Sequence, residues 1–346
     1  MSKGRISKGR ISKGRIAAAV TVAAAAALIC ALLIINIFYP LRYFTAYLVR
    51  AQRPPEGELS VYFLDVGQAD CAVAVLPDGQ TMLIDGGDGT YTNNLKIVTS
   101  LHSLGVNGID YLVCTSVNGE HCGGLAEIIN LYDVGTIFYP YCTNRYITEE
   151  FADFVSAAEL SGAEMVISEY GAGVNCGDFF FTFLSPAVHT SPDSEYGDLN
   201  SDPTEEAMNN ASAVMWMEYA GRGIFYASDV GGTVLSEIAQ TYTLLQELGD
   251  PDGYFSFEGH KIDFSACAAY KVAAHGHEDS RCTELADLLS PDISIISVGE
   301  NNASGCPSAA VVADLIAHGK IYMTQYAGDI LLSADGEGGC SVSVQL

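Results

Sequence analysis

The sequence predicts an α+β fold, a layered αββα sandwich preceded by one N-terminal transmembrane helix. Two observations support the sandwich: the chain contains two β-rich halves, and helical segments flank each of them. A third observation, an uncharged apolar run near the N-terminus, supports the membrane helix. With 346 residues, of which 49% are hydrophobic, the chain is long enough to bury the core of such a domain.

Residues 1–15 form a basic tail in which SKGRI is repeated without a break. Residues 16–39 follow without any charge, and about 24 residues at ~1.5 Å each span a hydrocarbon core of ~30 Å. Because the tail holds more positive charges than Arg42, Arg50 and Arg53 on the far side, we expect a cytoplasmic N-terminus and an extracytoplasmic main domain. Bulky aromatic residues after the run favour an uncleaved anchor over a signal peptide, which stays the alternative.

Residues 40–58 are predicted to be a linker, and residues 59–346 to be the folded domain. In the first half we expect strands at 59–65, 71–76 and 81–85, a helix at 93–104, a strand at 109–116, a helix at 124–131 and a strand at 134–140. In the second half we expect strands at 179–186, 212–220 and 222–229, a helix at 233–248, and strands at 270–274, 293–299, 321–325 and 329–334, with helices between them. The polar, acidic segment 189–209 is predicted to be a mobile surface loop between the halves.

Charge and cysteine content limit the function classes. The 42 Asp and Glu residues against 16 Lys and Arg residues leave a formal charge of −26, which argues against a general nucleic-acid binder. The ten cysteines contain no CxxC pair, and disulfides outside the cell stay open. Cys71 and Cys114, in apolar strands, are interpreted as small core residues, and Trp216 and the aromatic segment 138–146 as core and rim.

Five motifs carry a family resemblance. They are FLDVGQADCAVAVLPDGQTMLIDGG (63–87), TSVNGEHCGGL (115–125), NNASAVMWMEYAGRGIFYASD (209–229), YKVAAHG (270–276) and SIISVGENNASGCPS (294–308). In this order they resemble the hydrolase domain of the DNA-internalisation competence protein ComEC over roughly residues 59–335. The resemblance implies a metallo-β-lactamase-type αββα sandwich and a hydrolase, with a phosphodiester such as DNA as its substrate.

The resemblance also implies a metal site. The family places histidines and carboxylates at strand ends to hold two cations, commonly zinc or manganese, which lower the pKa of a bridging water. The family's loop ligands are His, Asp or His, Asp, and His, and the matching positions here are Ser116, Asn118, Glu120 and His121. Neither Ser116 nor Asn118 is a strong ligand for a transition cation, so we expect the first metal position to be dismantled.

The second metal position is better preserved. Glu120, His121, Asp229 and His275 could hold one divalent metal ion, with Asp229 and Glu120 as the predicted catalytic residues. The structural alternative for His121 is that it only caps a helix. Asp85, after an apolar strand, is expected to hold its loop by accepting hydrogen bonds from backbone N–H groups rather than to bind the metal.

Two further side chains at motif positions are candidate ligands. His277 takes a position at which the family usually has Ser, and Cys306 replaces a late His. Cys306 is equally interpreted as a small buried residue.

Two function classes stay open. The first is a membrane-anchored hydrolase with a single-metal or atypical site, for which the resemblance implies DNA as substrate while the charge disfavours it. The second is an inactive, metal-free scaffold that acts as an extracytoplasmic binding module. A hydrolase with a nucleophilic serine is not supported, because the chain has no GxSxG motif. The predicted partners are membrane lipid, through the N-terminal helix, and a separate membrane protein.

Overall fold

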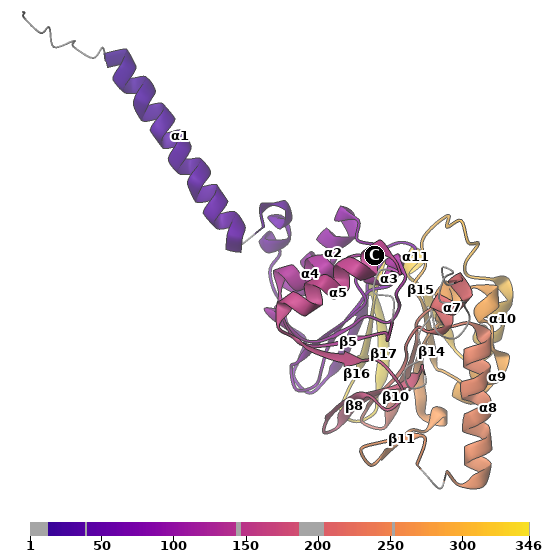
Figure 1. Ribbon diagram of the computed structural model, residues 1–346. Helices are drawn as coiled ribbons and strands as arrows, with labels where there is room; N and C mark the ends of the chain where they lie inside the picture. The colour runs from indigo at the N-terminus through magenta and orange to yellow at the C-terminus, as the bar shows by residue number, and fades with distance from the viewer. Residues whose placement is uncertain (1–12, 39, 143–146, 187–203, 251–252, 346) are drawn as a thin grey trace, which may run out of the picture.

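The computed structural model describes residues 13–38, 40–142, 147–186, 204–250 and 253–345 (Figure 1). Four of the predicted features lie partly outside these ranges: most of the basic tail (1–12), the last residue of the predicted anchor (39), the end of the aromatic segment (143–146) and most of the predicted loop (189–203).

The N-terminal apolar run forms one long helix, α1 (Lys13–Phe38). Its segment Ala18–Asn36 is long and apolar enough to cross a membrane, and none of it is buried against the rest of the chain. Figure 1 shows α1 standing apart from the folded domain. The predicted apolar helix is therefore present, and its length and composition fit a membrane span.

The segment predicted as a linker, 40–58, packs in part against the domain. It contains two short helices, η1 (Leu41–Tyr43) and η2 (Ala46–Leu48). Tyr43 and Ala46 are 0% exposed, and the hydroxyl of Tyr91 donates a hydrogen bond to the carbonyl oxygen of Arg42 at 2.7 Å. The segment directly after α1 thus contributes Tyr43 and Ala46 to the domain's core.

Two large sheets form the middle of the domain. The first has the order β17 (Cys340–Gln345), β16 (Asp329–Ala334), β1 (Leu59–Phe63), β2 (Ala72–Val75), β3 (Thr81–Ile84), β4 (Gly108–Val113), β5 (Asp133–Tyr139) and β6 (Glu164–Ile167). The second has the order β15 (Lys320–Met323), β14 (Ile293–Ile296), β13 (Cys267–Lys271), β10 (Arg222–Ala227), β9 (Val214–Tyr219), β8 (Phe179–Ser185) and β7 (Gly173–Cys176). A small hairpin, β11 (Ser256–Phe257) and β12 (His260–Lys261), is separate from both.

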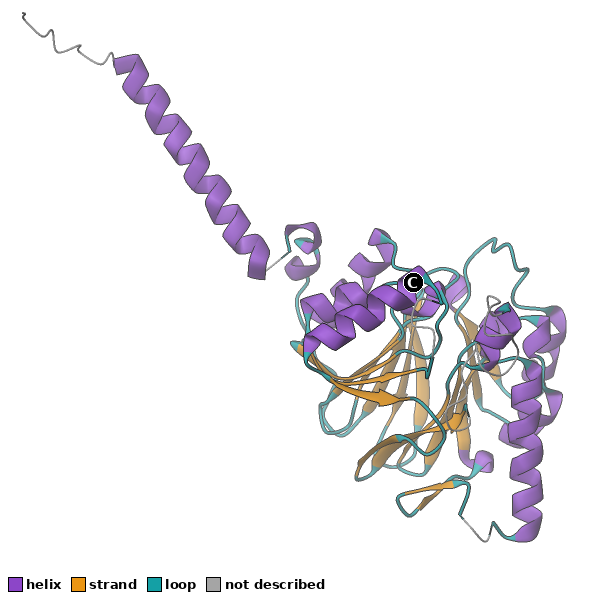
Figure 2. Cartoon of the chain, viewed as in Figure 1, coloured by secondary structure: helices purple, strands orange, loops and turns teal. Residues whose placement is uncertain are grey.

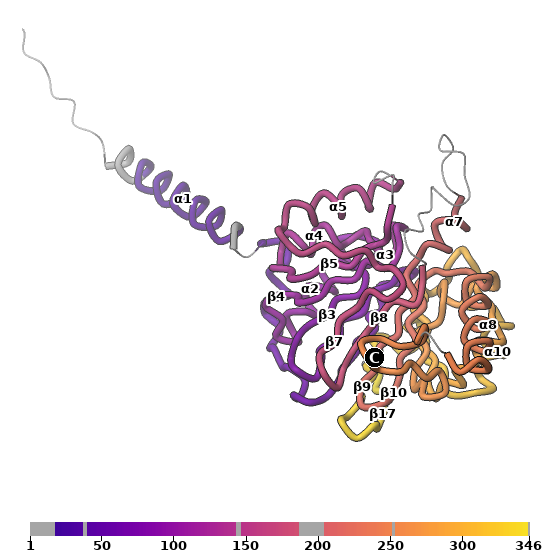
Figure 3. Tube along the Cα trace, turned by 60° about the horizontal axis from the view of Figure 1, so that its bottom comes forward, coloured from indigo at the N-terminus to yellow at the C-terminus, as the bar shows by residue number. Residues whose placement is uncertain are grey.

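Helices cover the outer face of each sheet (Figures 2 and 3). The first sheet is covered by α2 (Tyr91–Ser103), α4 (Leu125–Leu131) and α5 (Glu149–Ser161), and the second by α8 (Gly232–Leu248), α9 (Thr283–Leu289) and α10 (Ala309–Ile316). The shorter helices are α3 (Gly119–Cys122), α7 (Glu205–Asn210), α11 (Thr324–Ala327), η3 (Phe264–Ala266), η4 (Ala273–Gly276) and η5 (Glu278–Ser280). Helix α7 corrects the prediction that all of 189–209 is a loop: the side chain of Thr204 caps it by accepting from the N–H of Ala207 at 3.1 Å.

Three apolar clusters separate four layers. The central cluster lies between the sheets and includes Phe63, Phe181 and Met215. One outer cluster packs α2, α4 and α5 on the first sheet and contains Cys71 and Cys114, and the other packs α8, α9 and α10 on the second sheet and contains Trp216. The predicted αββα sandwich is confirmed, and Cys71, Cys114 and Trp216 are core residues as predicted.

Parallel strands bring the candidate residues to one edge. In the first sheet β3, β4 and β5 are parallel, and in the second β10, β13 and β14 are parallel. The carboxyl ends of parallel strands lie at the same edge of a sheet, and ligand sites are typically found outside it. Asp85 follows β3, Asp229 follows β10 and His275 follows β13, so residues distant in sequence meet there.

Candidate metal site

Close backbone packing fixes the loop that follows β4. The N–H of Gly86 donates to the carbonyl oxygen of His121 at 2.7 Å, and the N–H of Asp70 donates to that of Glu120 at 3.0 Å. A Cβ on Gly124 would lie 2.2 Å from the carbonyl oxygen of Gly86, so only glycine allows this approach. The short helix α3 is thereby held with Glu120 and His121 on the site side.

His121 lies between two carboxylates. Its side chain is 0% exposed, with Nδ1 2.9 Å from Asp85 Oδ2 and Nε2 2.9 Å from Asp229 Oδ2. Burial by itself would lower the pKa of His121, but Asp229 and Asp85 together raise the pKa well above its usual value. His121 is therefore oriented by acidic partners on both ring nitrogens, and its role goes beyond capping a helix.

Asp85 accepts hydrogen bonds from Thr115, and whether it also binds a metal stays a prediction. Its Oδ1 accepts a hydrogen bond from the backbone N–H of Thr115 at 2.7 Å, and its Oδ2 accepts from the Thr115 hydroxyl at 2.6 Å. Burial raises the pKa of Asp85, while His121 opposes that rise. Asp85 thus ties the end of β3 to the end of β4 and orients His121.

His275 is held in a single tautomer. Its Nδ1 lies 2.8 Å from the carbonyl oxygen of Ser297, and because a carbonyl only accepts, Nδ1 carries the proton. Its Nε2 lies 3.6 Å from Glu120 Oε1 and 3.9 Å from Asp229 Oδ1, and it is the nitrogen that presents a lone pair to a cation when the ring is neutral. Burial would lower the pKa of His275, but the nearby carboxylates, Glu120 first, raise it.

Asp229 connects the two histidines. It is 3% exposed, its Oδ2 faces His121, and its Oδ1 has no hydrogen-bond partner. Burial would raise the pKa of Asp229, but His121 and then His275 hold it well below its usual range. The carboxylate is therefore charged and has one unengaged oxygen.

Four side chains fit the coordination of one cation, and we call them the metal group: Glu120, His121, Asp229 and His275. Their ligand atoms all lie within 4.8 Å of one another, and Nε2 of His275 and Oδ1 of Asp229 are buried without a hydrogen-bond partner. Ligands at about 2.1 Å from a tetrahedral ion lie about 3.4 Å apart, and His275 Nε2 lies 3.6 Å from Glu120 Oε1 and 3.9 Å from Asp229 Oδ1. Buried polar atoms without partners are costly, so their convergence indicates a bound ligand.

Four candidate residues lie outside the metal group. The Ser116 hydroxyl oxygen accepts from the backbone N–H of Asn118 at 3.3 Å, and Asn118 Nδ2 donates to Asn209 Oδ1 at 2.7 Å. His277 is 41% exposed in its side chain and its Nδ1 accepts from the N–H of Asp279 at 3.2 Å. Cys306 is nearly buried, and burial raises the pKa of its thiol. The ligand roles of all these residues stay predictions.

A buried ion pair beneath the metal group was not predicted. Lys271, at the end of β13, and Asp70 are both 0% exposed and bonded to each other, and Asp70 Oδ2 lies 3.8 Å from His121 Nδ1. Burial would raise the pKa of Asp70, but Lys271 holds it below its usual value. The available sequence signal was a lysine inside the apolar run YKVAA, which requires a buried partner.

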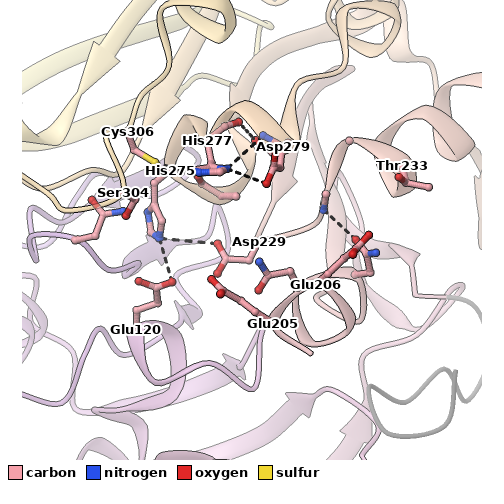
Figure 4. A pocket seen from close by; sticks show the side chains of 17 residues that line it. Glu120, Glu205, Glu206, Asp229, Thr233, His275, His277, Asp279, Ser304 and Cys306 are labelled. Carbon is pink, nitrogen blue, oxygen red and sulfur yellow. Dashed lines mark hydrogen bonds and ion pairs between the residues drawn. The ribbon is translucent and has the colours of Figure 1, made fainter. Parts of the chain in front are cut away.

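The metal group opens into a cavity of about 530 Å³. Figure 4 shows Glu120, Asp229 and His275 pointing toward one another at one side of it, with Glu205 and Glu206 of α7 nearby. The first residues of α8 and the side chains of His277, Asp279 and Cys306 also line it. The geometry therefore provides a site for a metal ion with room for a small substrate beside it.

Comparison with known proteins supports the family resemblance. No family model matches the chain. The chain is 23% identical over 292 residues to ComE operon protein 3 of Bacillus subtilis (strain 168). The aligned region covers 80% of this chain and 33% of that protein. It thus spans about a third of the length of this relative. Together with the four-layer architecture, this similarity confirms a ComEC-like domain with the metallo-β-lactamase fold.

Solved structures with weak similarity were also found. The metallo-beta-lactamase fold protein YhfI from Bacillus subtilis has a TM-score of 0.43 and 8% identity, covering 82% of this chain and 100% of that chain. Tm1679, a metal-dependent hydrolase of the beta-lactamase superfamily, has a TM-score of 0.45 and 9% identity, covering 83% and 100%.

Proposed function

We propose that this ComEC-like domain is a hydrolase that works with a single divalent cation, zinc or manganese, bound by the metal group. The observation that carries the proposal is the convergence of two buried ligand atoms without a hydrogen-bond partner, Nε2 of His275 and Oδ1 of Asp229, beside Nε2 of His121, which lies 2.9 Å from the other carboxylate oxygen of Asp229. Each histidine is oriented through its other ring nitrogen, as metal-binding histidines usually are. A structural core without a ligand has no need for this arrangement.

The side chains of the metal group differ in solvent exposure, and we assign their roles on this basis. When bound, the cation would lower the pKa of a water molecule and polarise the substrate oxygen. Glu120 is 35% exposed in its side chain, whereas Asp229 and His275 are at most 5% exposed. Glu120 is therefore the member that can exchange a proton with a substrate in the cavity, while Asp229 and the histidines hold the ion.

A non-catalytic binding module is the second candidate function. It is favoured by the hydrogen bonds of Ser116 and Asn118, which are satisfied within the protein and leave nothing at the first metal position to hold a cation. In this case the cavity would bind a partner without turning it over. The two candidates differ in whether the purified protein contains metal.

We further propose that α1 anchors the domain at the outer face of a membrane, with the N-terminus in the cytoplasm. The basic tail supports this orientation. Directly after α1, Leu41, Phe44 and Leu48 are 40%, 57% and 67% exposed, and we call them the juxtamembrane apolar face. Because this face begins three residues after the apolar helix ends, it fits the lipid interface. The separate membrane protein partner stays a prediction.

Metal analysis of the full-length protein tests the hydrolase. We expect about one equivalent of zinc or manganese after purification in detergent without chelator, and loss of most of it in His275→Ala and Asp229→Ala. His277→Ala is the matched control, because His277 lies on the same loop but outside the metal group. Absence of metal in the unmodified protein, with a melting curve unchanged by added cations, would contradict the proposal and favour the binding module.

A further inference from the structure

We propose that the cavity above the metal group selects acyl substrates, such as esters, thioesters or amides, that carry a positive charge, and that it rejects anionic phosphodiesters. The inference rests on the proposed hydrolase and names its substrate class. It combines two observations: the buried, unpaired ligand atoms at one side of the cavity and the uncompensated carboxylates around the rest of it.

The charged side chains of the cavity are nearly all acidic. Among the 17 residues that line it in the described part of the chain there is no Lys or Arg, whereas there are five carboxylates (Figure 4). They come from separate elements: Glu120 from α3, Glu205 and Glu206 from α7, Asp229 after β10 and Asp279 from η5. Acidic groups thus surround the space in which a substrate would lie.

A bound cation does not neutralise this charge. One divalent ion offsets Glu120 and Asp229, which leaves Glu205, Glu206 and Asp279, of which Asp279 has the imidazole of His277 3.6 Å from its carboxylate. Lys271 does not help, because it is 0% exposed and bonded to Asp70. A polyanionic substrate would therefore meet net repulsion after the metal is bound.

Helix α8 offers a small opposing effect. Its first residues, Gly231, Gly232 and Thr233, line the cavity and have no side-chain cap, and a helix N-terminus is equivalent to about half a positive charge. Half a charge is outweighed by three carboxylates. The exposed Glu205 and Glu206 are not needed to cap their own helix, because Thr204 does so, and this leaves them available to a ligand.

The metal count favours acyl over phosphoryl chemistry. Two-metal sites stabilise both the attacking and the leaving oxygen of a phosphoryl transfer, whereas one metal with His and carboxylate ligands suffices for acyl hydrolysis. In the reaction used for the test, water forms a bond to the acetyl carbon and the C–S bond breaks. The thiolate leaves with the electron pair, and acetate, thiol and one proton are the products.

Three acetyl thioesters that differ only in charge test the inference. Their leaving groups are (2-mercaptoethyl)trimethylammonium, 2-mercaptoethanol and 3-mercaptopropionate, and bis(4-nitrophenyl) phosphate serves as the phosphodiester. With metal-loaded full-length protein at low salt, we expect kcat/KM for the cationic ester to exceed that for the anionic one at least ~tenfold, and this ratio to shrink at ~1 M salt. An anionic ester or the phosphodiester as the preferred substrate would overturn the inference.

Charge-neutralising variants locate the selectivity. Glu205→Gln/Glu206→Gln is expected to bring the cation-to-anion ratio close to one. Glu149→Gln/Glu150→Gln is the matched control, because this pair also follows a threonine cap in the first turn of a helix, α5, but does not line the cavity. If the control changes the ratio as much as the cavity variant does, the selectivity comes from overall charge and the inference fails.

A binding measurement separates this inference from the proposed function. The same three thiols are titrated against the cobalt(II)-substituted protein, and binding is followed by thiolate-to-cobalt absorption. If they bind in the order cationic, neutral, anionic but no thioester is hydrolysed, the substrate charge is supported and the hydrolase is refuted. If turnover occurs with the opposite order of charge, the hydrolase stands and this inference is refuted. Absence of bound metal overturns both.

Discussion

The buried Lys271–Asp70 pair makes a strong prediction about stability. Both side chains are 0% exposed, and Asp70 Oδ1 has no hydrogen-bond partner. Lys271→Met keeps most of the side-chain length and removes the charge, which leaves a carboxylate in the interior without its cation. Removing one partner of a buried pair costs about 3–5 kcal/mol in free energy of unfolding. At ~2–4 °C per kcal/mol for a domain of this size class, the melting temperature should fall by about 10 °C.

The loss should depend on pH. Without Lys271, burial is the largest remaining effect on Asp70 and raises its pKa. A carboxyl whose pKa is raised in the folded state costs stability as the pH rises from its unfolded pKa of about 4 to its folded pKa, because over this range the unfolded chain loses the proton while the folded protein keeps it. Lys271→Met should therefore be more destabilising at about pH 7 than at about pH 4, where the carboxyl is protonated in much of the unfolded chain as well. In Asp70→Asn/Lys271→Met neither charge remains, and most of the loss should be recovered.

Equilibrium unfolding in urea of the full-length protein in detergent measures these changes. Trp216 is the single tryptophan and is 0% exposed, so its fluorescence reports the folding of the sandwich without a signal from α1. The unmodified protein and the two variants form a cycle from which the coupling between the side chains is calculated. A loss below about 1 kcal/mol in Lys271→Met, or a double variant no more stable than the single one, would refute the reasoning.

Three further predictions concern the site and the membrane. Because the pKa values of His121 and His275 are raised, metal binding should release about two protons, and the metal affinity should increase as the pH rises above ~6.5. Calorimetry in buffers of different ionisation enthalpy counts the released protons. If no protons are released, the metal-free site is not protonated and the prediction is wrong. Gly124→Ala should destabilise the domain by about 1–3 kcal/mol, because its Cβ would lie 2.2 Å from a carbonyl oxygen; unchanged urea unfolding would contradict this packing. In lipid nanodiscs, Phe44→Trp fluorescence should be quenched by brominated lipid, whereas Leu248→Trp, exposed on α8 away from α1, should not be (Figures 1 and 3); equal quenching would contradict the juxtamembrane apolar face.

The central strands could be predicted because burial on both faces gives them apolar runs. TMLID and RGIFYASD, for example, contain β3 and β10 with only small differences at their ends. The missed elements lie where this signal is weak. Strands β6 and β7 are at sheet edges and have no fully buried residue, and β17 alternates as CSVSVQ after a glycine-rich turn that could have been recognised as a hairpin.

The site was predictable from motif order but not from local pattern. The motifs placed Glu120, Asp229 and His275 at the ends of strands that the fold brings together, and the structure shows them as neighbours. The partner of Lys271 could not be predicted, because Asp70 is 201 residues away in the chain. The burial of Tyr43 was equally hidden, since an aromatic residue next to an apolar helix is also typical of a membrane interface.

The hydrogen bonds of Asp229 explain why one ion is expected and not two. Oδ2 of Asp229 lies 2.9 Å from His121 Nε2 and accepts from Asn118 Nδ2 at 3.4 Å, so this oxygen is not free for a second cation. Asn118→Asp removes that amide donor, yet it should still leave one equivalent of metal, because Ser116 offers only a neutral hydroxyl at the first position. Ser116→His/Asn118→His supplies two imidazoles there and should raise the metal content toward two equivalents. A second equivalent in the unmodified protein, or none added by the double variant, would contradict this explanation of the metal count.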